Sequence, residues 1–132
     1  MEMAWQNIAL GMAGVIGGGV AVVHGVLVQR FMVRPFDALA RADGSIGGST
    51  RRLIPLLLQF STFAWLLGGL ALIAAANGFE QQARLTTSLF VGSLYLFGAV
   101  ANLWARRGRH PGWVLMAAAL VLILLGANKP GV

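Results

Sequence analysis

The sequence consists mainly of four apolar runs, and its arginines gather in the first and third of the stretches that connect these runs. The runs cover residues 7–28, 53–76, 86–104 and 111–127. At about 1.5 Å per residue, helices of these lengths suit a hydrocarbon core of roughly 30 Å, the fourth being the shortest at about 25 Å. A helix pairs its backbone groups within its own segment, as lipid requires. We therefore expect an all-α fold, an antiparallel four-helix transmembrane bundle that forms a single domain, 1–132.

The composition predicts a surface that faces lipid. Hydrophobic residues make up 58% of the chain, and charged residues make up only 11%. In soluble domains, hydrophobic residues make up about one half of the chain and charged residues about one quarter. The low charge is the stronger signal, because a surface in water needs charge and a surface in lipid does not. The absence of cysteine excludes disulfides, thiolate metal sites and cysteine nucleophiles.

The basic residues predict how the bundle is oriented. The connection 29–52 contains five arginines and the connection 105–110 contains three, together eight of the ten Lys and Arg residues. These connections share one face of an antiparallel bundle, and basic connections stay in the cytoplasm. We expect a multi-pass protein of the bacterial inner membrane with both termini periplasmic. The net charge of +6 then reflects topology, and no nucleic-acid partner is expected.

The connection 29–52 is the only long one, and it has internal features. Pro35 can open a short helix on which Phe36, Leu39 and Ala40 share one face. We expect an interfacial helix of about two turns, with its apolar side among the lipid headgroups. The glycine-rich stretch 44–50 would then act as a flexible hinge.

Two adjacent arginines follow this hinge. Backbone N–H groups at the start of the second span, together with Arg51 and Arg52, could bind a phosphate, and a lipid headgroup is the expected source. The alternative is a flexible hinge whose arginines only set the topology.

Small residues form a stripe along the first span. They recur at steps of three and four and therefore share one helix face: Gly11, Gly14, Gly18, Ala21 and Gly25. Such a stripe lets two helices approach closely and gain dispersion contacts in lipid. Two interpretations follow: packing against another helix of the same chain, or an interface in a homo-oligomer or a larger membrane complex.

Several polar residues fall at a similar depth near the cytoplasmic ends of the spans: His24, Gln59, Thr62, Asn102 and His110. One interpretation is a network of hydrogen bonds between helices, in which His24 would bond to Gln59 or Asn102. The other is a binding site for a small apolar ligand, haem or lipid. Under the first interpretation no cofactor is expected; under the second, haem b would be the cofactor, with His24 and His110 as its axial ligands, and no other metal is expected.

No catalytic motif and no charged residue is found inside the four predicted spans. Ion-coupled transporters usually have an ionisable group at mid-membrane, and enzymes need a reactive constellation. We therefore expect a non-enzymatic membrane protein, a structural or accessory subunit that associates with itself or with a larger membrane complex. The alternative is a binder or carrier of a small apolar ligand, haem or lipid within the bundle.

Two segments of the chain are similar to those of known proteins. VQRFMVRPFDAL (28–39) and RGRHPGWVL (107–115) resemble segments of an uncharacterised family of small four-span bacterial inner-membrane proteins. The resemblance implies the fold and the location but no activity. Enrichment in Ala, Gly and Arg with a single Lys is also typical of a GC-rich bacterium.

Overall fold

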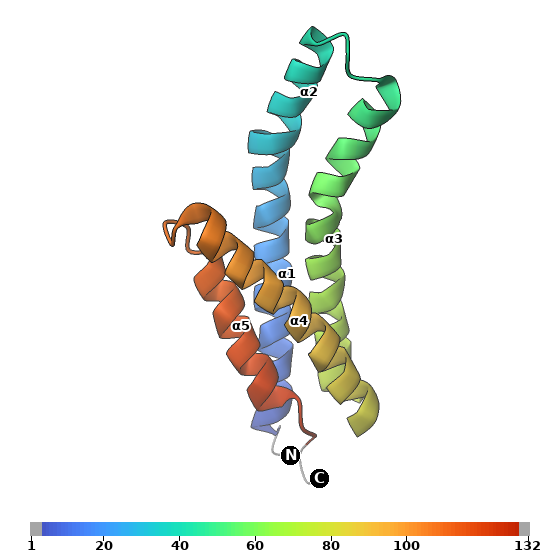
Figure 1. Ribbon diagram of the computed structural model, residues 1–132. Coiled ribbons are helices and arrows are strands. Elements are labelled where there is room, and N and C mark those ends of the chain that lie inside the picture. Colours follow the sequence, from blue (N-terminus) through green and yellow to red (C-terminus); the bar gives the residue numbers. More distant parts are fainter. Residues whose placement is uncertain (1–3, 130–132) are drawn as a thin grey trace.

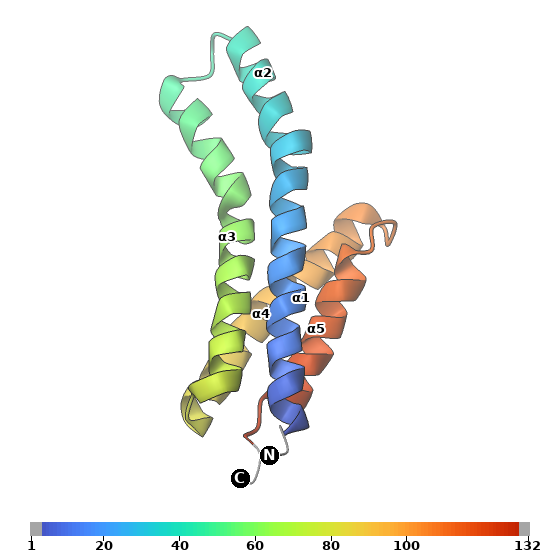
Figure 2. The ribbon, with the colours of Figure 1, turned by 180° about the vertical axis from the view of Figure 1, so that it is seen from behind.

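The computed structural model describes residues 4–129, and all of its regular elements are helical. The elements in chain order are α1 (Trp5–Val28), the π-helical turn η1 (Gln29–Val33), α2 (Arg34–Ala42), α3 (Gly48–Gly78), α4 (Gln81–Arg106) and α5 (Gly112–Gly126). The expected all-α fold is therefore confirmed over the described part of the chain. Figures 1 and 2 show α1 at the centre of the bundle, with α3 on one side and α5 on the other.

Three helices are long and apolar enough to cross a membrane: the continuous helix Trp5–Ala42, α3 and α4. The apolar helix α5 is shorter, at 15 residues. Helices α3 and α4 each begin five residues before the expected spans, at Gly48 and Gln81 instead of 53 and 86. Polar residues continue each helix beyond its apolar run, and a pattern based on hydropathy does not detect such turns.

The expected interfacial helix is instead a direct continuation of α1. Helices α1 and α2 are joined without interruption through η1 and share one axis (Figures 1 and 2). The widened turn lies just before Pro35, whose ring and missing N–H do not fit a regular α-helical interior. The joined helix has 38 residues, or about 57 Å at 1.5 Å per residue, which exceeds the roughly 30 Å of a hydrocarbon core.

Helix α2 and the first turns of α3 form a hairpin that extends beyond the α4–α5 turn (Figure 1). Asp37 joins its two arms, because it pairs with Arg41 at 2.9 Å and with Arg51 of α3 at 3.4 Å. In the connecting turn, Asp43 accepts a hydrogen bond from the backbone N–H of Ser45 at 2.9 Å. Hydrogen bonding by the side chain of Ser45, and then by its backbone N–H, lowers the pKa of the Asp43 carboxyl below its ordinary value.

Helices α1 and α3 make backbone contact at three glycines. A Cβ atom added to Gly69 would lie 2.6 Å from the carbonyl oxygen of Gly14 and 2.9 Å from the backbone nitrogen of Gly18. A Cβ on Gly14 would collide with the carbonyl of Gly69. A Cβ on Gly18 itself would meet only Leu66, at 3.9 Å. The tightest point of the small-residue stripe is therefore Gly14, one turn before Gly18.

The rest of the stripe also faces α3. A Cβ on Gly11 would lie 4.0 Å from the side chain of Ala76, and one on Gly25 would lie 2.7 Å from Thr62. Ala21 is fully buried in the core. Of the two interpretations of the stripe, the geometry therefore fits packing within one chain.

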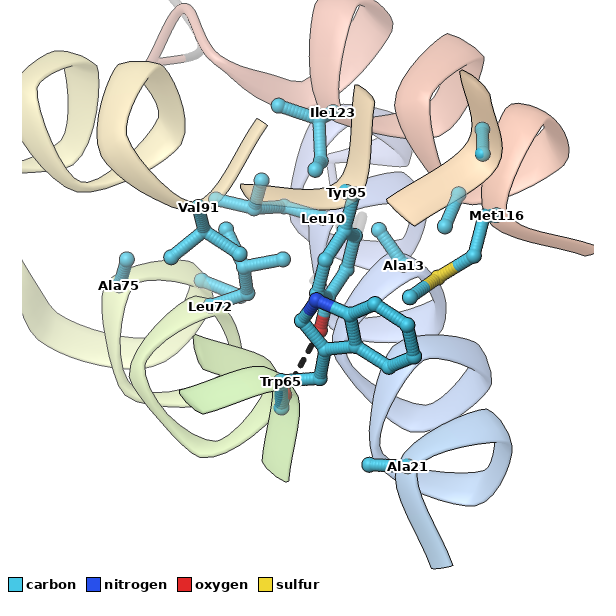
Figure 3. Close-up of a cluster of buried hydrophobic side chains, with 13 residues drawn as sticks. Leu10, Ala13, Ala21, Trp65, Leu72, Ala75, Val91, Tyr95, Met116 and Ile123 are labelled. Atoms are coloured by element: carbon cyan, nitrogen blue, oxygen red, sulfur yellow. Dashed lines mark hydrogen bonds between the residues drawn. The ribbon is translucent and has the colours of Figure 1, made fainter. Parts of the chain in front are cut away.

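The core of the bundle is centred on two aromatic residues from different helices. The hydroxyl of Tyr95 in α4 donates a hydrogen bond to the backbone oxygen of Trp65 in α3, at 3.2 Å (Figure 3). The Tyr95 ring fills the space that a side chain at Gly17 of α1 would need. The indole of Trp65 fills the equivalent space beside Gly98 of α4, where an added Cβ would lie 2.6 Å from it. Glycines on α1 and α4 thus make room for large rings in the core.

A buried arginine joins three helices at the end where Ala4 and Lys129 lie. Arg84 is 1% exposed. Its Nε and Nη2 atoms donate to the carbonyl oxygen of Gly126 at 2.9 and 2.7 Å, and its Nη1 donates to Asn7 Oδ1 at 2.7 Å. Arg84 lies in the first turn of α4, before the expected span 86–104, so a charged residue is buried within the helix although outside that span. The site suits a cation because it lies at the carbonyl end of α5, where the helix dipole is negative.

Candidate functional site

A half-enclosed cavity of 340 Å³ lies between α1, α3, the end of α4 and the start of α5. Its walls are mainly aliphatic and come from α1 and α5, including Val15, Ile16, Val20, Val23, Leu27 and Leu115. The indole of Trp65 contributes from α3. Three of the polar residues singled out in the sequence also line it: His24, Asn102 and His110. We call this space the histidine cavity.

His24 faces the interior of the bundle, as expected, but with a different partner. Its Nε2 atom lies 3.1 Å from the hydroxyl oxygen of Ser61. Its ring centre lies 4.6 Å from that of Trp65, with an angle of 51° between the planes. The expected hydrogen bond to Gln59 or Asn102 is not formed, because Ser61 and Trp65, one turn apart on α3, occupy the face opposite His24. The imidazole is therefore held in place on one wall of the cavity.

His110 and Asn102 provide the other polar atoms of the histidine cavity. The Nδ1 atom of His110 accepts a hydrogen bond from the backbone N–H of Gly112, at 3.1 Å. A neutral imidazole that accepts at Nδ1 carries its proton on Nε2, so His110 can donate from that atom. Asn102 Nδ2 donates to the backbone oxygen of Gly98 at 2.8 Å, which leaves its Oδ1 as an acceptor. The cavity thus combines apolar walls with one donor and one acceptor near the α4–α5 turn.

Gln59 and Thr62 belong to a different region. Both lie in a second groove of 610 Å³, between the continuous helix and α3, together with Arg30 and Arg34. Gln59 Nε2 donates to the backbone oxygen of Gly25 at 3.0 Å, and Thr62 Oγ1 donates to Gln59 Oε1 at 2.9 Å. The polar residues of similar depth are therefore divided between two faces of α1.

Arg51 and Arg52 do not form the expected anion site together, because only one of the two guanidiniums is without a carboxylate partner among the described residues. The Nε atom of Arg51 lies 3.4 Å from Asp37, so a carboxylate already neutralises it. The backbone N–H of Arg51 bonds to the carbonyl of Gly47 at 3.1 Å. Arg52 is exposed on the hairpin. An added phosphate would have to compete with Asp37 for one of the two guanidiniums.

Metal ligation has little support in the described residues. Among residues 4–129, no three His, Cys, Asp or Glu side chains lie close enough to hold a metal ion together. Haem binding by His110 would need a free nitrogen on its ring. While Nδ1 accepts the hydrogen bond from Gly112, the neutral ring carries its proton on Nε2. Metal-bound imidazoles show the opposite arrangement, since their second nitrogen donates to a carbonyl or carboxylate. Only His24 could then act as an axial ligand.

Two features of the bundle, one in the cavity and one at the opposite end, could not be assigned from sequence reasoning. Trp65 lies in the middle of the run 53–76, where the hydropathy pattern does not distinguish a core side chain from one that faces lipid. Arg84 was assigned to a connection, because a single arginine next to a helix start has the same sequence pattern as an exposed one. Asn7, its partner, lies 77 residues away in the chain.

Comparison of the chain with protein-family models, with curated proteins and with solved structures gave no match. The functional interpretation therefore depends on the geometry of the chain itself.

Proposed function

We propose that the protein is a non-enzymatic four-span protein of the bacterial inner membrane that binds a small apolar molecule with a polar head in the histidine cavity. The observation that supports this proposal most is the cavity itself. Its volume of 340 Å³ falls within the range of about 300–1,000 Å³ that small-molecule sites occupy. Its aliphatic walls suit an apolar body, and His110 and Asn102 suit a head that both accepts and donates hydrogen bonds.

The position of the cavity also supports access from the bilayer. Several wall residues on α1 are also partly exposed on the bundle surface, such as Val15 and Val23 at 64% and 56%. A molecule dissolved in lipid could therefore enter sideways without passing through water. The polar groups lie near the arginine-rich α4–α5 turn, where an amphipathic molecule places its head. Binding and carrying such a molecule needs no reactive group.

A structural or accessory role in a larger membrane complex is the second candidate. The small-residue stripe no longer supports it, because α3 covers that face. The protruding hairpin supports it better. Leu39 of α2 and Leu56 of α3 are each 69% exposed on this hairpin, where a partner subunit could cover them.

The proposed orientation places the hairpin in the cytoplasm and both termini in the periplasm. The chain has no cysteine, so an introduced cysteine is a unique label. We expect an impermeant thiol reagent to label Gln82→Cys in intact cells with a permeabilised outer membrane, and to label Gly47→Cys only after lysis. Labelling of Gly47→Cys but not of Gln82→Cys would reverse the orientation.

Ligand binding predicts a gain in thermal stability that depends on the cavity. Gly19 lines the cavity, and a Cβ atom there would meet nothing within 4 Å, so Gly19→Phe should fill the space without disturbing the bundle. Adding an apolar extract of native membranes to purified, delipidated protein should stabilise the wild type by about 2–3 kcal/mol at a hundredfold excess over Kd. Gly19→Phe should not respond.

A matched control is Leu124→Phe, which introduces a ring at a position where the leucine is 76% exposed. This variant should respond as the wild type does. An equal response of Gly19→Phe would show that the extract stabilises the outer surface and would contradict the proposal. An absorbance spectrum of the purified protein separates the possible ligands, because a Soret band would identify haem and a colourless protein would exclude it.

A further inference from the structure

The second groove changes from apolar to cationic along the axis of the continuous helix. Val22 and Val26 line its inner part, and Arg30 and Arg34 line its outer part towards the hairpin. Residues four apart share one face of an α-helix, which places Val22, Val26 and Arg30 on one stripe, and Arg34 lines the same groove. The π-helical turn, in which the N–H of Arg34 bonds to the carbonyl of Gln29, shifts the register by one residue, and Arg34 still lines the groove beyond it.

The two arginines of the groove lack a carboxylate partner within residues 4–129. The acids of the hairpin are engaged elsewhere: Asp37 pairs with Arg41 and Arg51, and Asp43 accepts from Ser45. The guanidinium of Arg30 lies over the ring of its neighbour Phe31, 5.5 Å from the ring centre. The outer part of the groove is therefore a concentration of positive charge that no carboxylate in the described part of the chain neutralises.

Neutral polar groups lie between the apolar and the cationic parts. Gln59 Nε2 donates to the carbonyl of Gly25 at 3.0 Å and approaches Gln29 Oε1 at 3.4 Å. The sequence of groups from the bundle centre outward is therefore aliphatic, amide and guanidinium. The same order is found along a phospholipid, from acyl chain through ester to phosphate.

The depth of the arginines fits a headgroup. Arg30 follows His24 by six residues, or about 9 Å along the helix. His24 lines the same cavity as His110, which adjoins the arginine-rich α4–α5 turn. If that turn lies at the membrane surface, Arg30 and Arg34 lie at the level of the phosphates or slightly beyond it.

We propose that this groove binds one anionic phospholipid. Arg30 and Arg34 hold its phosphate, Gln29 and Gln59 face its ester region, and one acyl chain lies along Val22 and Val26. Charge complementarity selects an anionic lipid over a zwitterionic one, and the aliphatic wall selects a lipid over free phosphate. The proposal depends on the chain being embedded in a membrane, but not on any ligand in the histidine cavity.

The test is native mass spectrometry of the full chain in neutral detergent, titrated with phosphatidylglycerol, phosphatidylcholine or inorganic phosphate. We expect the first phosphatidylglycerol to bind about tenfold or more tightly than phosphatidylcholine. The double variant Arg30→Gln/Arg34→Gln should lose most of this preference. The double variant Arg107→Gln/Arg109→Gln, which removes the same charge from the α4–α5 turn, should keep it.

A second variant tests the acyl-chain part without changing charge. Val26 is 62% exposed, so Val26→Trp should fold and should block the inner groove. It should weaken binding of phosphatidylglycerol and leave any binding of inorganic phosphate unchanged. Three results would each overturn the proposal. They are an equal loss of the preference for phosphatidylglycerol in both double variants, unchanged lipid binding in Val26→Trp, and displacement of the lipid by equimolar inorganic phosphate.

Discussion

Replacing Arg84 by methionine should destabilise the protein by about 3 kcal/mol, because it leaves two acceptors without a donor, each at a cost of about 1–3 kcal/mol. The substitution removes three hydrogen bonds that join α4 to Asn7 of α1 and to the carbonyl of Gly126 in α5. Methionine keeps a similar volume, so the loss comes from acceptors that remain buried without a donor. The measurement is the free energy of unfolding in mixed micelles titrated with sodium dodecyl sulfate.

Gln82→Met is the matched control for this experiment. Gln82 lies in the same turn of α4 but is exposed, and its replacement should change the free energy of unfolding by less than about 0.5 kcal/mol. Equal stability of Arg84→Met and Gln82→Met would mean that the buried guanidinium contributes nothing to holding the three helices together. It would also contradict the burial of the Arg84 guanidinium between the three helices.

The second large effect is expected at the contact between α1 and α3. Gly14→Ala should destabilise the protein by about 2–3 kcal/mol, as insertion of atoms into a packed core does. The new Cβ would collide with the carbonyl of Gly69 and lie 2.8 Å from the side chain of Ile73, so the backbones would have to separate. Gly69→Ala should have a similar effect from the other helix, because its Cβ would lie 2.6 Å from the carbonyl of Gly14.

Gly19→Ala is the control, because a Cβ at this position of the same helix would meet nothing within 4 Å. Alanine is the better helix former by about 1 kcal/mol in water, so this variant should be neutral or slightly more stable. Both variants can be compared in one unfolding titration. A Gly14→Ala protein as stable as Gly19→Ala would contradict the close approach of the two helices.

The helical fold was predictable because hydropathy and the requirement for internal backbone pairing leave few alternatives. The pattern also located three helices that are long enough to cross a membrane, although it placed their starts up to five residues late. The glycines of the stripe from Gly11 to Gly25 face α3, with tight contacts at Gly14 and Gly25, since spacing alone puts them on one face of the helix. The four-span topology and its orientation remain predictions.

The details of the site depend on contacts that the sequence does not encode locally. The hydrogen bond between His24 and Ser61 depends on the relative rotation of α1 and α3, which spacing within one helix cannot predict. The burial of Arg84 requires Asn7 and Gly126 to meet at one end of the bundle. The continuation of α1 into α2 depends on η1, which accommodates Pro35 without a break. In each case, the local structure depends on a residue that is distant in the sequence or on a change in helix geometry.

We propose that the histidine cavity holds a small apolar molecule taken from the membrane. The most direct measurement is extraction of purified protein, isolated from native membranes in polymer-bounded bilayer discs, followed by mass spectrometry of the extract. We predict that one class of small apolar molecule accompanies the wild type and Leu124→Phe in near-stoichiometric amount and is lost from Gly19→Phe, in which the cavity is filled. Identical extracts from wild type and Gly19→Phe, with both proteins folded, would contradict the claim.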